Sequence, residues 1–232
     1  MLKRTCDILG SILGLVVMSP LLALIAVAIR IGSPGPVLFR QDRLGLDGRR
    51  FRIYKFRSMV VDAEWRGARF TVGGDSRITP VGRFLRRHKL DELPQLINVL
   101  SGEMSLVGPR PEVPEFAELY PSEFAQMLRI KPGITHRATL CFRNEEELLA
   151  ASTDPTRAYI DKIMPAKMQL YIDSMPHQSV RADILTIVAT VLRYGETFTP
   201  EDLDIDTPKI AKIPVSRIEE RVLAPSARET VA

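Results

Sequence analysis

Two adjacent carboxylates and one arginine within residues 89–111 are the residue types that phosphoryl chemistry needs. Asp91 and Glu92 precede a short predicted helix and could supply a nucleophile or base and a metal ligand. Arg110 lies between Pro109 and Pro111, which restrict the backbone on both sides of it. Its planar guanidinium is suited to phosphate. This combination predicts an active site for phosphoryl transfer.

Ordinary helix capping is the competing interpretation of the two carboxylates, because acidic residues often precede helices. Pro94 argues against it. Proline favours the first helical turn and is expected to push Leu93 away from helical geometry, which leaves Asp91 and Glu92 outside the helix with oxygens free for a metal. Nearby cations should keep both carboxylates ionised and could hold a diphosphate, although a solvated basic face would need no function: Arg83, Arg86, Arg87 and Lys89.

Basic residues are concentrated in two stretches, 30–57 and 77–89, although the formal net charge is only +4. The first stretch ends with Lys55 and Arg57, for which surface charge is again the simpler interpretation. Such clusters favour anionic partners, namely lipid headgroups, nucleotide phosphates or nucleic acid. Nucleic acid is the weakest of these, because the basic runs lack interleaved aromatic residues.

The length of 232 residues, 45% of them hydrophobic, fits one globular domain with an appendage. Cys6 and Cys141 are too few for a disulfide framework or a thiolate metal site, and they fit a reducing cytosol. No redox role is expected.

The N-terminal segment has the length and polarity of a membrane helix. Residues 8–29 contain no charged side chain, and at about 1.5 Å per residue they would extend roughly 33 Å, close to the thickness of a bilayer. A cleaved signal peptide is disfavoured, because the apolar run is too long and Arg30 stands where a small-residue cleavage site would be expected.

Ser19 and Pro20 lie at the middle of this segment and predict a kink. Pro20 removes a backbone donor, and the Ser19 hydroxyl could satisfy the carbonyl that is freed. The positive-inside tendency would place both ends of the segment in the cytoplasm, because basic residues flank each end: Lys3 and Arg4 on one side, and Arg30, Arg40 and Arg43 on the other. Kinks also occur in spanning helices, so the residues alone leave a spanning and a re-entrant helix open.

The rest of the chain predicts a mixed α/β, mostly helical fold with short elements. A β-hairpin is expected from strands 37–40 and 51–56, joined by a turn at 45–48. The helices are expected at 59–66, 80–89, 94–100, 112–120, 122–129 and 180–192. The last of these is amphipathic and is either a core helix or an interfacial one. We expect a membrane helix over 1–32, a catalytic domain over 33–196 and an extended tail over 197–232.

Taken together, these features resemble the monotopic phosphoglycosyl transferases, or bacterial sugar transferases, which load a sugar phosphate onto polyprenyl phosphate. The resemblance extends from Lys3 to about Arg193. It is carried by the Ser19-Pro20 apolar helix and by five motifs in order: Gly35-Pro-Val-Leu-Phe-Arg-Gln-Asp-Arg-Leu-Gly45, Lys55-Phe-Arg-Ser-Met59, Leu90-Asp-Glu-Leu-Pro-Gln-Leu96, Met104-Ser-Leu-Val-Gly-Pro-Arg-Pro111 and Lys131-Pro-Gly-Ile-Thr135.

The resemblance implies a re-entrant membrane helix shaped by Ser19 and Pro20. Beside such a membrane helix, we expect an interfacial position for the amphipathic helix. It implies that Asp91 is the nucleophile and that Glu92 is its partner at a Mg²⁺ ion. It implies that Arg110 contacts the nucleotide sugar. By position, four further residues fall on polar sites that the family uses for phosphate binding or for holding the active site together: Lys55, Arg86, Arg143 and Asp183. We also expect Arg57 to bind substrate and Asp183 to have the structural role.

The implied reaction starts with attack of Asp91 on the sugar-bearing phosphorus of a UDP-sugar and release of UMP. The phosphate of membrane polyprenyl (undecaprenyl) phosphate then attacks the aspartyl-phosphosugar, which initiates bacterial glycoconjugate or exopolysaccharide synthesis. The implied location is the cytoplasmic face of the inner membrane. The partners expected are the UDP-sugar, the polyprenyl phosphate and membrane lipid, while a homodimer is compatible with the sequence and nucleic acid is not expected.

One region departs from the pattern of the resemblance. Many relatives continue after the Ile134-Thr135 pair with Gly-Trp-Ala-Gln-Val and Gly-Arg-Asn, whereas this chain has residues 136–144 of different sequence, followed by three glutamates. Arg143 therefore carries over less securely than Arg110. The run Glu145–Glu147 is expected to start a helix rather than to form a second metal site.

Two further expectations concern the whole protein. The length leaves no room for the extra domains of larger relatives, so the minimal form of the family is expected. The alternative function is a catalytically silent, membrane-anchored scaffold for glycosyltransferases, against which the presence of Asp91, Glu92 and Arg110 argues.

Overall fold

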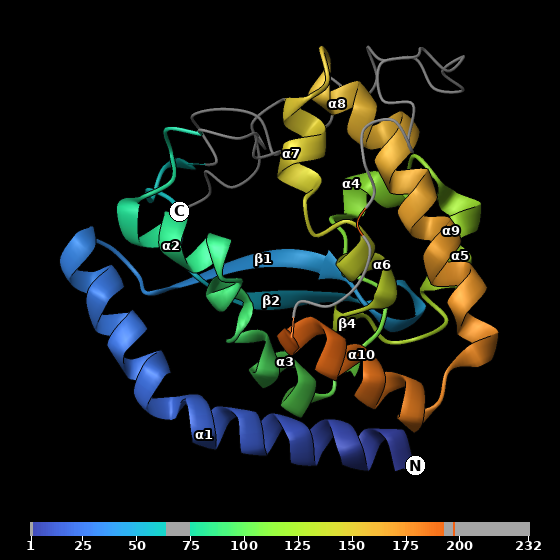
Figure 1. Cartoon of the computed structure of the whole chain (residues 1–232), viewed down its shortest axis with the longest axis horizontal. Helices are drawn as coiled ribbons and strands as arrows, with labels where there is room; N and C mark the ends of the chain where they lie inside the picture. Colours follow the sequence, from blue (N-terminus) through green and yellow to red (C-terminus); the bar gives the residue numbers. More distant parts are fainter. Residues whose placement is uncertain (1, 64–74, 193–196, 198–232) are drawn as a thin grey trace, which may run out of the picture.

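The computed structural model describes residues 2–63, 75–192 and 197, and Figure 1 shows a mixed α/β, mostly helical fold. The first element, α1 (Leu2–Gly32), is a helix of 31 residues with Pro20 in its interior. The hydroxyl of Ser19 donates a hydrogen bond of 2.8 Å to the carbonyl of Val16, the acceptor that the missing Pro20 N–H leaves free. Figure 1 shows α1 bent between its two halves, as the Ser19-Pro20 pair predicts.

Polar contacts attach the N-terminal half of α1 to the globular part of the chain. The carboxylate of Asp7 is buried and accepts hydrogen bonds of 3.0 Å from the Ser105 hydroxyl and the Leu106 N–H. Lys3 forms an ion pair with Asp183. A buried carboxylate with these partners fixes the register of the helix on its support.

Apolar contacts attach the C-terminal half of α1 to the same globular part. Ile25 and Ile29 are buried in one cluster with Phe56 and Leu85. Both halves of α1 therefore rest on one body, on either side of the bend (Figure 1).

The remaining surface of α1 is apolar and exposed. An 18-residue window of the helix has a mean hydropathy of 2.8 and is only 11% buried, so α1 is long and apolar enough to cross a membrane. The exposed apolar side chains are Leu2, Leu9, Ile12, Leu13, Val16, Val17, Leu24, Val27 and Ile31.

The predicted hairpin is present. Strands β1 (Leu38–Leu44) and β2 (Arg50–Phe56) pair antiparallel from Leu38↔Phe56 to Leu44↔Arg50, and the short helix η1 (Leu46–Gly48) closes the turn. Strand β1 extends beyond the expected residue 40, because the pairing continues to the turn. Asn98 is fully buried and bonds the backbone of β2, accepting from the Tyr54 N–H and donating to the Arg52 carbonyl.

Three helical elements follow the hairpin: α2 (Pro80–Arg87), the one-turn helix η3 (Leu90–Glu92) and α3 (Gln95–Ser101). The expected helix at 59–66 is wrong over its described part, 59–63. Met59 pairs with Ile78 in a β-bridge, and Val60 donates its N–H to the carbonyl of Arg77, so long-range pairing satisfies this backbone. Residues 64–66 lie outside the described residues.

A second, parallel strand pair was not predicted. Strands β3 (Ser105–Val107) and β4 (Gly133–Thr135) pair from Ser105↔Gly133 to Val107↔Thr135. The backbones approach so closely that a Cβ on Gly108 would clash with the Lys131 carbonyl, and one on Gly133 would clash with Gly108. This contact joins two segments that are separate motifs in the sequence, one with Gly108-Pro109 and the other with Pro132-Gly133.

The C-terminal half is helical and is built around α9 (Met164–Ser174), whose buried residues share one core with Phe116, Phe124, Phe142 and Leu148. The acidic run starts a helix as predicted, and the expected helices at 112–120 and 122–129 are present but shorter. The remaining elements are α4 (Pro114–Ala117), α5 (Pro121–Met127), α6 (Arg137–Cys141), α7 (Glu145–Ala150), α8 (Pro155–Ala158), the π-helical turn η4 (Tyr159–Ile163) and the one-turn helix η5 (Met175–His177).

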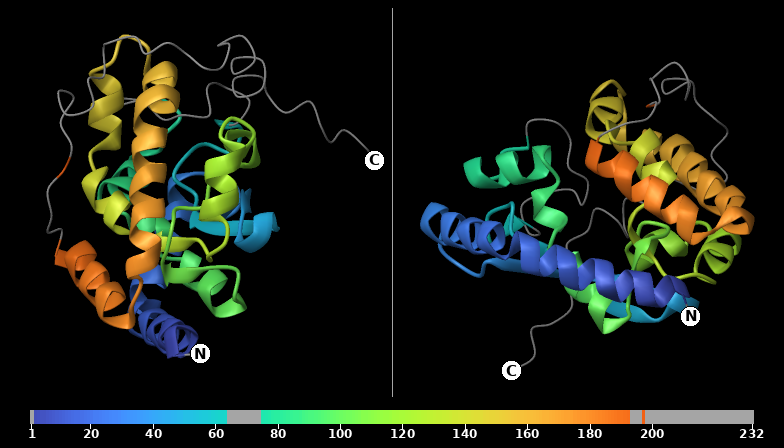
Figure 2. Two further views of the ribbon diagram at one scale, coloured as in Figure 1. Left: turned by 90° about the vertical axis from the view of Figure 1, so that its right-hand side faces the viewer. Right: turned by 60° about the horizontal axis from the view of Figure 1, so that its bottom comes forward.

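Helix α10 (Val180–Leu192) has the bounds that its amphipathic pattern predicts, but it is not a core helix. None of its residues, all of which the structure describes, is buried, and Leu185, Val191 and Leu192 are among its exposed apolar side chains. It contacts α1, and the left view of Figure 2 shows it beside the N-terminal half of that helix. The expected tail over 197–232 lies outside the described residues, apart from residue 197.

Candidate active site

The two predicted catalytic carboxylates lie in η3, immediately before α3. Lys89 precedes them with a left-handed backbone (φ 57°, ψ 22°), which turns the chain at the end of α2. The expectation that Pro94 keeps Leu93 out of helical geometry is wrong, since Leu93 is helical (φ −55°, ψ −36°) and donates its N–H to Leu90. Burial of Pro94 and Leu96 in the body outweighs the local preference.

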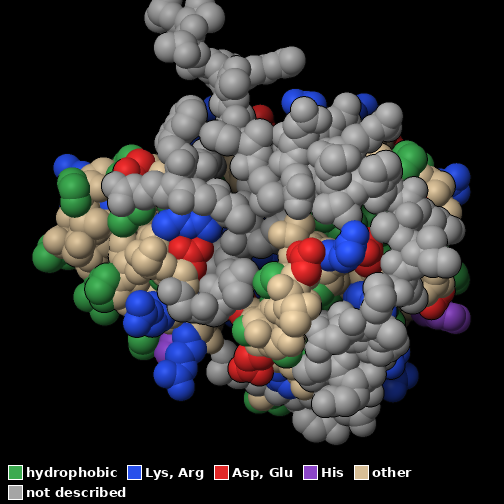
Figure 3. All heavy atoms as spheres, turned by 90° about the horizontal axis from the view of Figure 1, so that it is seen from above, with side chains coloured by type: hydrophobic (Ala, Val, Ile, Leu, Met, Phe, Trp, Pro, Cys, Tyr) green, Lys and Arg blue, Asp and Glu red, His purple; other side chains and the backbone are tan. Residues whose placement is uncertain are grey.

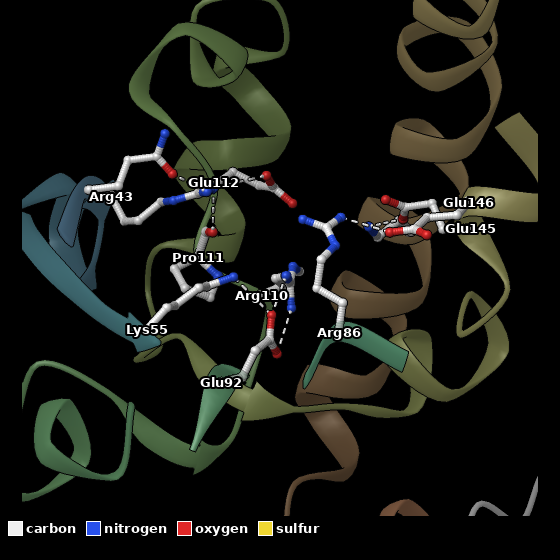
Figure 4. Close-up of polar contacts among 11 residues, drawn as sticks. Arg43, Lys55, Arg86, Glu92, Arg110, Pro111, Glu112, Glu145 and Glu146 are labelled. Atoms are coloured by element: carbon white, nitrogen blue, oxygen red, sulfur yellow. Dashed lines mark hydrogen bonds and ion pairs between the residues drawn. The ribbon is translucent and has the colours of Figure 1, made fainter. Parts of the chain in front are cut away.

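Glu92 is held by two cations from distant parts of the chain (Figure 4). Lys55, on β2, donates to Oε1 at 2.8 Å. Arg110 makes a two-pronged contact, with its guanidinium nitrogens 2.7 Å from Oε1 and 3.2 Å from Oε2. The sequence prediction that these three residues belong to one site is therefore matched by their geometry, but the oxygens of Glu92 are not free as expected.

The segment around Arg110 is set by the β3–β4 contact. The carbonyl of Pro109 accepts the N–H of Gly133, and the carbonyl of Pro111 accepts a hydrogen bond from Arg43 at 3.2 Å. The backbone on each side of Arg110 is thus bonded as well as restricted by proline. The guanidinium is presented to Glu92 from a fixed support.

The surroundings shift the pKa values of Asp91 and Glu92 in opposite directions. Burial opposes ionisation of Glu92, but the charges of Arg110 and Lys55 outweigh it and hold the pKa of Glu92 well below its usual value. The Glu92 charge in turn raises the pKa of Arg110 well above its usual value. Burial lowers the pKa of Lys55, and Glu92 offsets this only in part. Glu92 is therefore the permanently charged member of the pair.

Asp91 behaves in the opposite way. Its side chain is buried, and Oδ1 has no hydrogen-bond partner among the described residues. Burial and the Glu92 charge raise the pKa of Asp91, while Lys55 and Arg86 act in the other direction and are outweighed. The expectation that the nearby cations dominate both carboxyls thus fails for Asp91.

The pair Asp91 and Glu92 fits a Mg²⁺ ion that takes its other ligands from elsewhere. Mg²⁺ in phosphoryl-transfer sites is commonly held by one or two carboxylates, with substrate phosphates and water completing six ligands. The described residues contain no group of three His, Cys, Asp or Glu that could hold a metal alone. Within the described residues, the buried Oδ1 of Asp91 has no hydrogen-bond partner, so a bound cation would satisfy it.

Arg86 and the start of α7 form the other side of the site (Figure 4). Arg86 reaches from α2 to Glu146, with 2.7 Å between the guanidinium and Oε1. The neighbouring Glu145 is bound at 2.7 Å by Lys167 of α9. Seen from the side opposite α1, the described surface shows acidic and basic side chains side by side (Figure 3).

The other predicted site residues, Arg57, Arg143 and Asp183, lie on other segments of the chain. Arg57 is buried and donates to the carbonyls of Ser33 and Pro34, so it closes the loop after α1. Arg143 lies in the turn between α6 and α7. Asp183, on α10, forms the ion pair with Lys3 near the N-terminus of α1.

Sequence reasoning missed three residues around this site: Arg43, Glu112 and Lys167. The Arg43 guanidinium lies 3.7 Å from Glu112, and Glu112 is also buried beside Arg110. Proximity of Glu112 to the Pro-Arg-Pro segment was the one available signal. Lys167 had none, because it lies in a helix that the sequence did not predict.

Comparison with known proteins agrees with this geometry. The sequence model of the family described as bacterial sugar transferase matches residues 1–196. This chain belongs to that family. Together with the exposed apolar surface of α1, family membership indicates association with a membrane.

Three relatives have printed activities. A UDP-N-acetylgalactosamine-undecaprenyl-phosphate N-acetylgalactosaminephosphotransferase of Aeromonas hydrophila is 44% identical over 69% of this chain and 37% of its own length. A putative undecaprenyl-phosphate N-acetylgalactosaminyl 1-phosphate transferase of Bacillus subtilis is 43% identical over 59% of this chain and 72% of its own. A UDP-glucose:undecaprenyl-phosphate glucose-1-phosphate transferase of Escherichia coli is 40% identical over 83% of this chain and 40% of its own. The chain thus spans less than half the length of two of these relatives.

Proposed function

We propose that this chain transfers a sugar 1-phosphate from a UDP-sugar to membrane undecaprenyl phosphate and releases UMP. The observation that carries the proposal is the contrast between the two adjacent carboxylates in η3. Among the described residues, Asp91 has a buried oxygen without a hydrogen-bond partner, and Glu92 beside it is fixed by Lys55 and Arg110. Relatives whose names state this kind of reaction support it.

Asp91 is the nucleophile in the proposed reaction. Its carboxylate oxygen attacks the sugar-bearing phosphorus of the donor, and the phosphoanhydride bond to UMP breaks, so that UMP leaves with the bonding electrons. The product is an aspartyl-phosphosugar, in which the new bond joins Asp91 to phosphorus. An oxygen of undecaprenyl phosphate then attacks the same phosphorus and restores the Asp91 carboxylate. Because Oδ1 of Asp91 accepts no hydrogen bond from the part of the chain that the structure describes, it keeps its lone pairs available for this attack.

Lys55, Arg86 and Arg110 hold the diphosphate of the donor. Each already contacts a carboxylate in the site, and each can exchange that contact for a phosphate oxygen. Asp91 and Glu92 would hold Mg²⁺, which when bound neutralises charge on the diphosphate. Positioning and charge neutralisation are expected to supply most of the rate.

The membrane arrangement follows from α1 and α10. Both halves of α1 rest on one globular body, so a helix that enters and leaves the same leaflet would let both attachments persist, whereas a spanning helix would break one of them. The exposed apolar side chains of α10 are suited to the membrane interface. We infer that the protein is monotopic on the cytoplasmic face of the inner membrane.

The direct test is release of UMP from a panel of donors in the presence of undecaprenyl phosphate and Mg²⁺. The panel includes UDP-glucose and UDP-N-acetylgalactosamine, the donors that the names of the relatives indicate. One donor should give UMP and a lipid-linked diphosphate sugar with the wild-type chain and none above background with Asp91→Asn. A chain that binds membrane but releases UMP from no donor would be a scaffold instead.

A further inference from the structure

The cations that the proposed function assigns to the donor diphosphate are all paired with carboxylates in this structure. Lys55 and Arg110 share Glu92, which the proposed Mg²⁺ would also contact. Arg86 pairs with Glu146, a residue to which the proposed reaction gives no task. The Arg86–Glu146 contact is therefore the one that calls for a separate explanation.

The position of Arg86 places it at the reacting centre. It lies in the last turn of α2, which packs against η3, the one-turn helix that carries Asp91 and Glu92. Figure 4 shows Arg86 extending from α2 towards α7, with Glu146 on its far side and Arg110 beneath. A phosphate bound next to Asp91 and a carboxylate at Glu146 would compete for the same guanidinium.

The two glutamates at the start of α7 differ in how firmly they are held. Glu145 pairs with Lys167, whose side chain is only 6% exposed and lies over the rings of Phe142 and Tyr159. Glu146 is 50% exposed and Arg86 25% exposed, so their contact is open to solvent. The Glu145 contact is sheltered on its lysine side, whereas both partners of the Glu146 contact reach solvent, so the Glu146 contact is the more readily exchanged. Helix α7 can remain in place while Glu146 releases Arg86.

We propose that Glu146 is a positioning residue for the donor site, which holds Arg86 in an exchangeable ion pair that the diphosphate of the donor must displace. The proposal rests on the proposed function, because it takes Arg86 to bind the donor. Glu146 then sets the affinity for the donor without taking part in the chemistry.

The test measures binding of UDP in the presence of Mg²⁺ by calorimetry, on the full chain in detergent or nanodiscs. Glu146→Gln should tighten binding about two- to fivefold, the range that a solvent-exposed ion pair can supply. It should lower the KM for the UDP-sugar by a similar factor and leave kcat within about twofold. The gain should shrink at high salt, because screening weakens the pair that wild type has to break.

Glu147→Gln is the matched control. Glu147 lies in the same first turn of α7, is exposed, and makes no ion pair within the described part of the chain. Glu147→Gln therefore removes the same charge from the same helix end as Glu146→Gln does, but it breaks no ion pair with Arg86. It should bind UDP as wild type does. In an Arg86→Ala background, Glu146→Gln should no longer tighten binding, because the residue that it releases is absent.

The proposal is overturned if Glu146→Gln binds UDP as Glu147→Gln does. It is also overturned if Glu146→Gln weakens binding, which would make Glu146 a direct donor contact, or if the gain persists without Arg86. Failure of the proposed function looks different, since the wild-type chain would then neither bind UDP nor release UMP, and both proposals would fall.

Discussion

Glu92 is the residue on which the geometry of the site depends. It brings together Lys55 from the hairpin and Arg110 from the segment after β3, and these contacts outweigh the cost of burying its charge. At Asp91, one residue earlier, burial and the Glu92 charge outweigh the surrounding cations. Neighbouring carboxyls with opposite pKa shifts are a common way to separate a reactive group from a binding group.

Arg110→Lys should lower turnover by about tenfold or more. A lysine ammonium keeps the charge but cannot reproduce the two-pronged contact that the guanidinium makes with Glu92, nor one with phosphate. Steady-state UMP release measures the effect, with the exposed Arg129→Lys as the control. Activity near that of wild type would reduce Arg110 to a generic charge.

Asp91→Asn should stabilise the folded chain while it abolishes activity. The folded-state pKa of Asp91 is raised, so its ionised form destabilises the fold, and this cost is absent below the unfolded pKa of about 3.9 and complete above the folded pKa. Removing this cost should raise the Tm near neutral pH, and each kcal/mol removed corresponds to about 2–4 °C in a chain of this size.

The measurement for Asp91→Asn is thermal unfolding in detergent over a series of pH values. The gain in Tm should decrease as the pH is lowered towards about 4, since wild-type Asp91 then becomes protonated. The exposed Glu147→Gln should show no comparable trend. A variant less stable than wild type at neutral pH would show that Asp91 is not held at a cost.

At the level of elements, the sequence predicted those whose signal is local. Helix α10 has the predicted bounds because its apolar period is regular, and the hairpin follows from alternation around a Gly-bounded turn. Pairing between distant segments carries no such signal. The β3–β4 pair and the bridge from Met59 to Ile78 were therefore missed or taken for helix.

In the site, too, the sequence predicted the local features but not the contacts between distant segments. Adjacent carboxylates and a proline-flanked arginine were recognisable as chemistry in the sequence, and Lys55, Glu92 and Arg110 do meet. Which cation pairs with which acid depends on the tertiary fold. Arg57, predicted to bind substrate, closes a loop, and Glu146 contacts Arg86 across 60 residues of sequence.

Pro20→Ala should straighten α1 and move part of the population towards a spanning state. Alanine restores the N–H that can bond Val16, so the Ser19 hydroxyl is no longer needed there. In intact cells carrying Cys141→Ser, a membrane-impermeant thiol reagent should leave Cys6 unlabelled in the wild-type helix and label a fraction of it in the variant. Labelling of Cys6 without the proline change would mean a spanning helix.

At the scale of the molecule, α1 and α10 lie together on one side (Figures 1 and 2), and both carry exposed apolar side chains. This arrangement suits a reaction between a soluble donor and a lipid acceptor. The proposed covalent intermediate would let the two substrates occupy one site in turn, so that they need not be bound at the same time. The order of the two half-reactions is therefore the central claim.

The most direct test of this claim is mass spectrometry of the chain after incubation with its UDP-sugar and Mg²⁺ in the absence of any lipid acceptor. UMP should be released in an amount that approaches one equivalent per chain, and the peptide that contains Asp91 should gain the mass of one sugar phosphate. Addition of undecaprenyl phosphate should remove the adduct. An adduct on Glu92, or UMP that appears only when both substrates are present, would contradict the account.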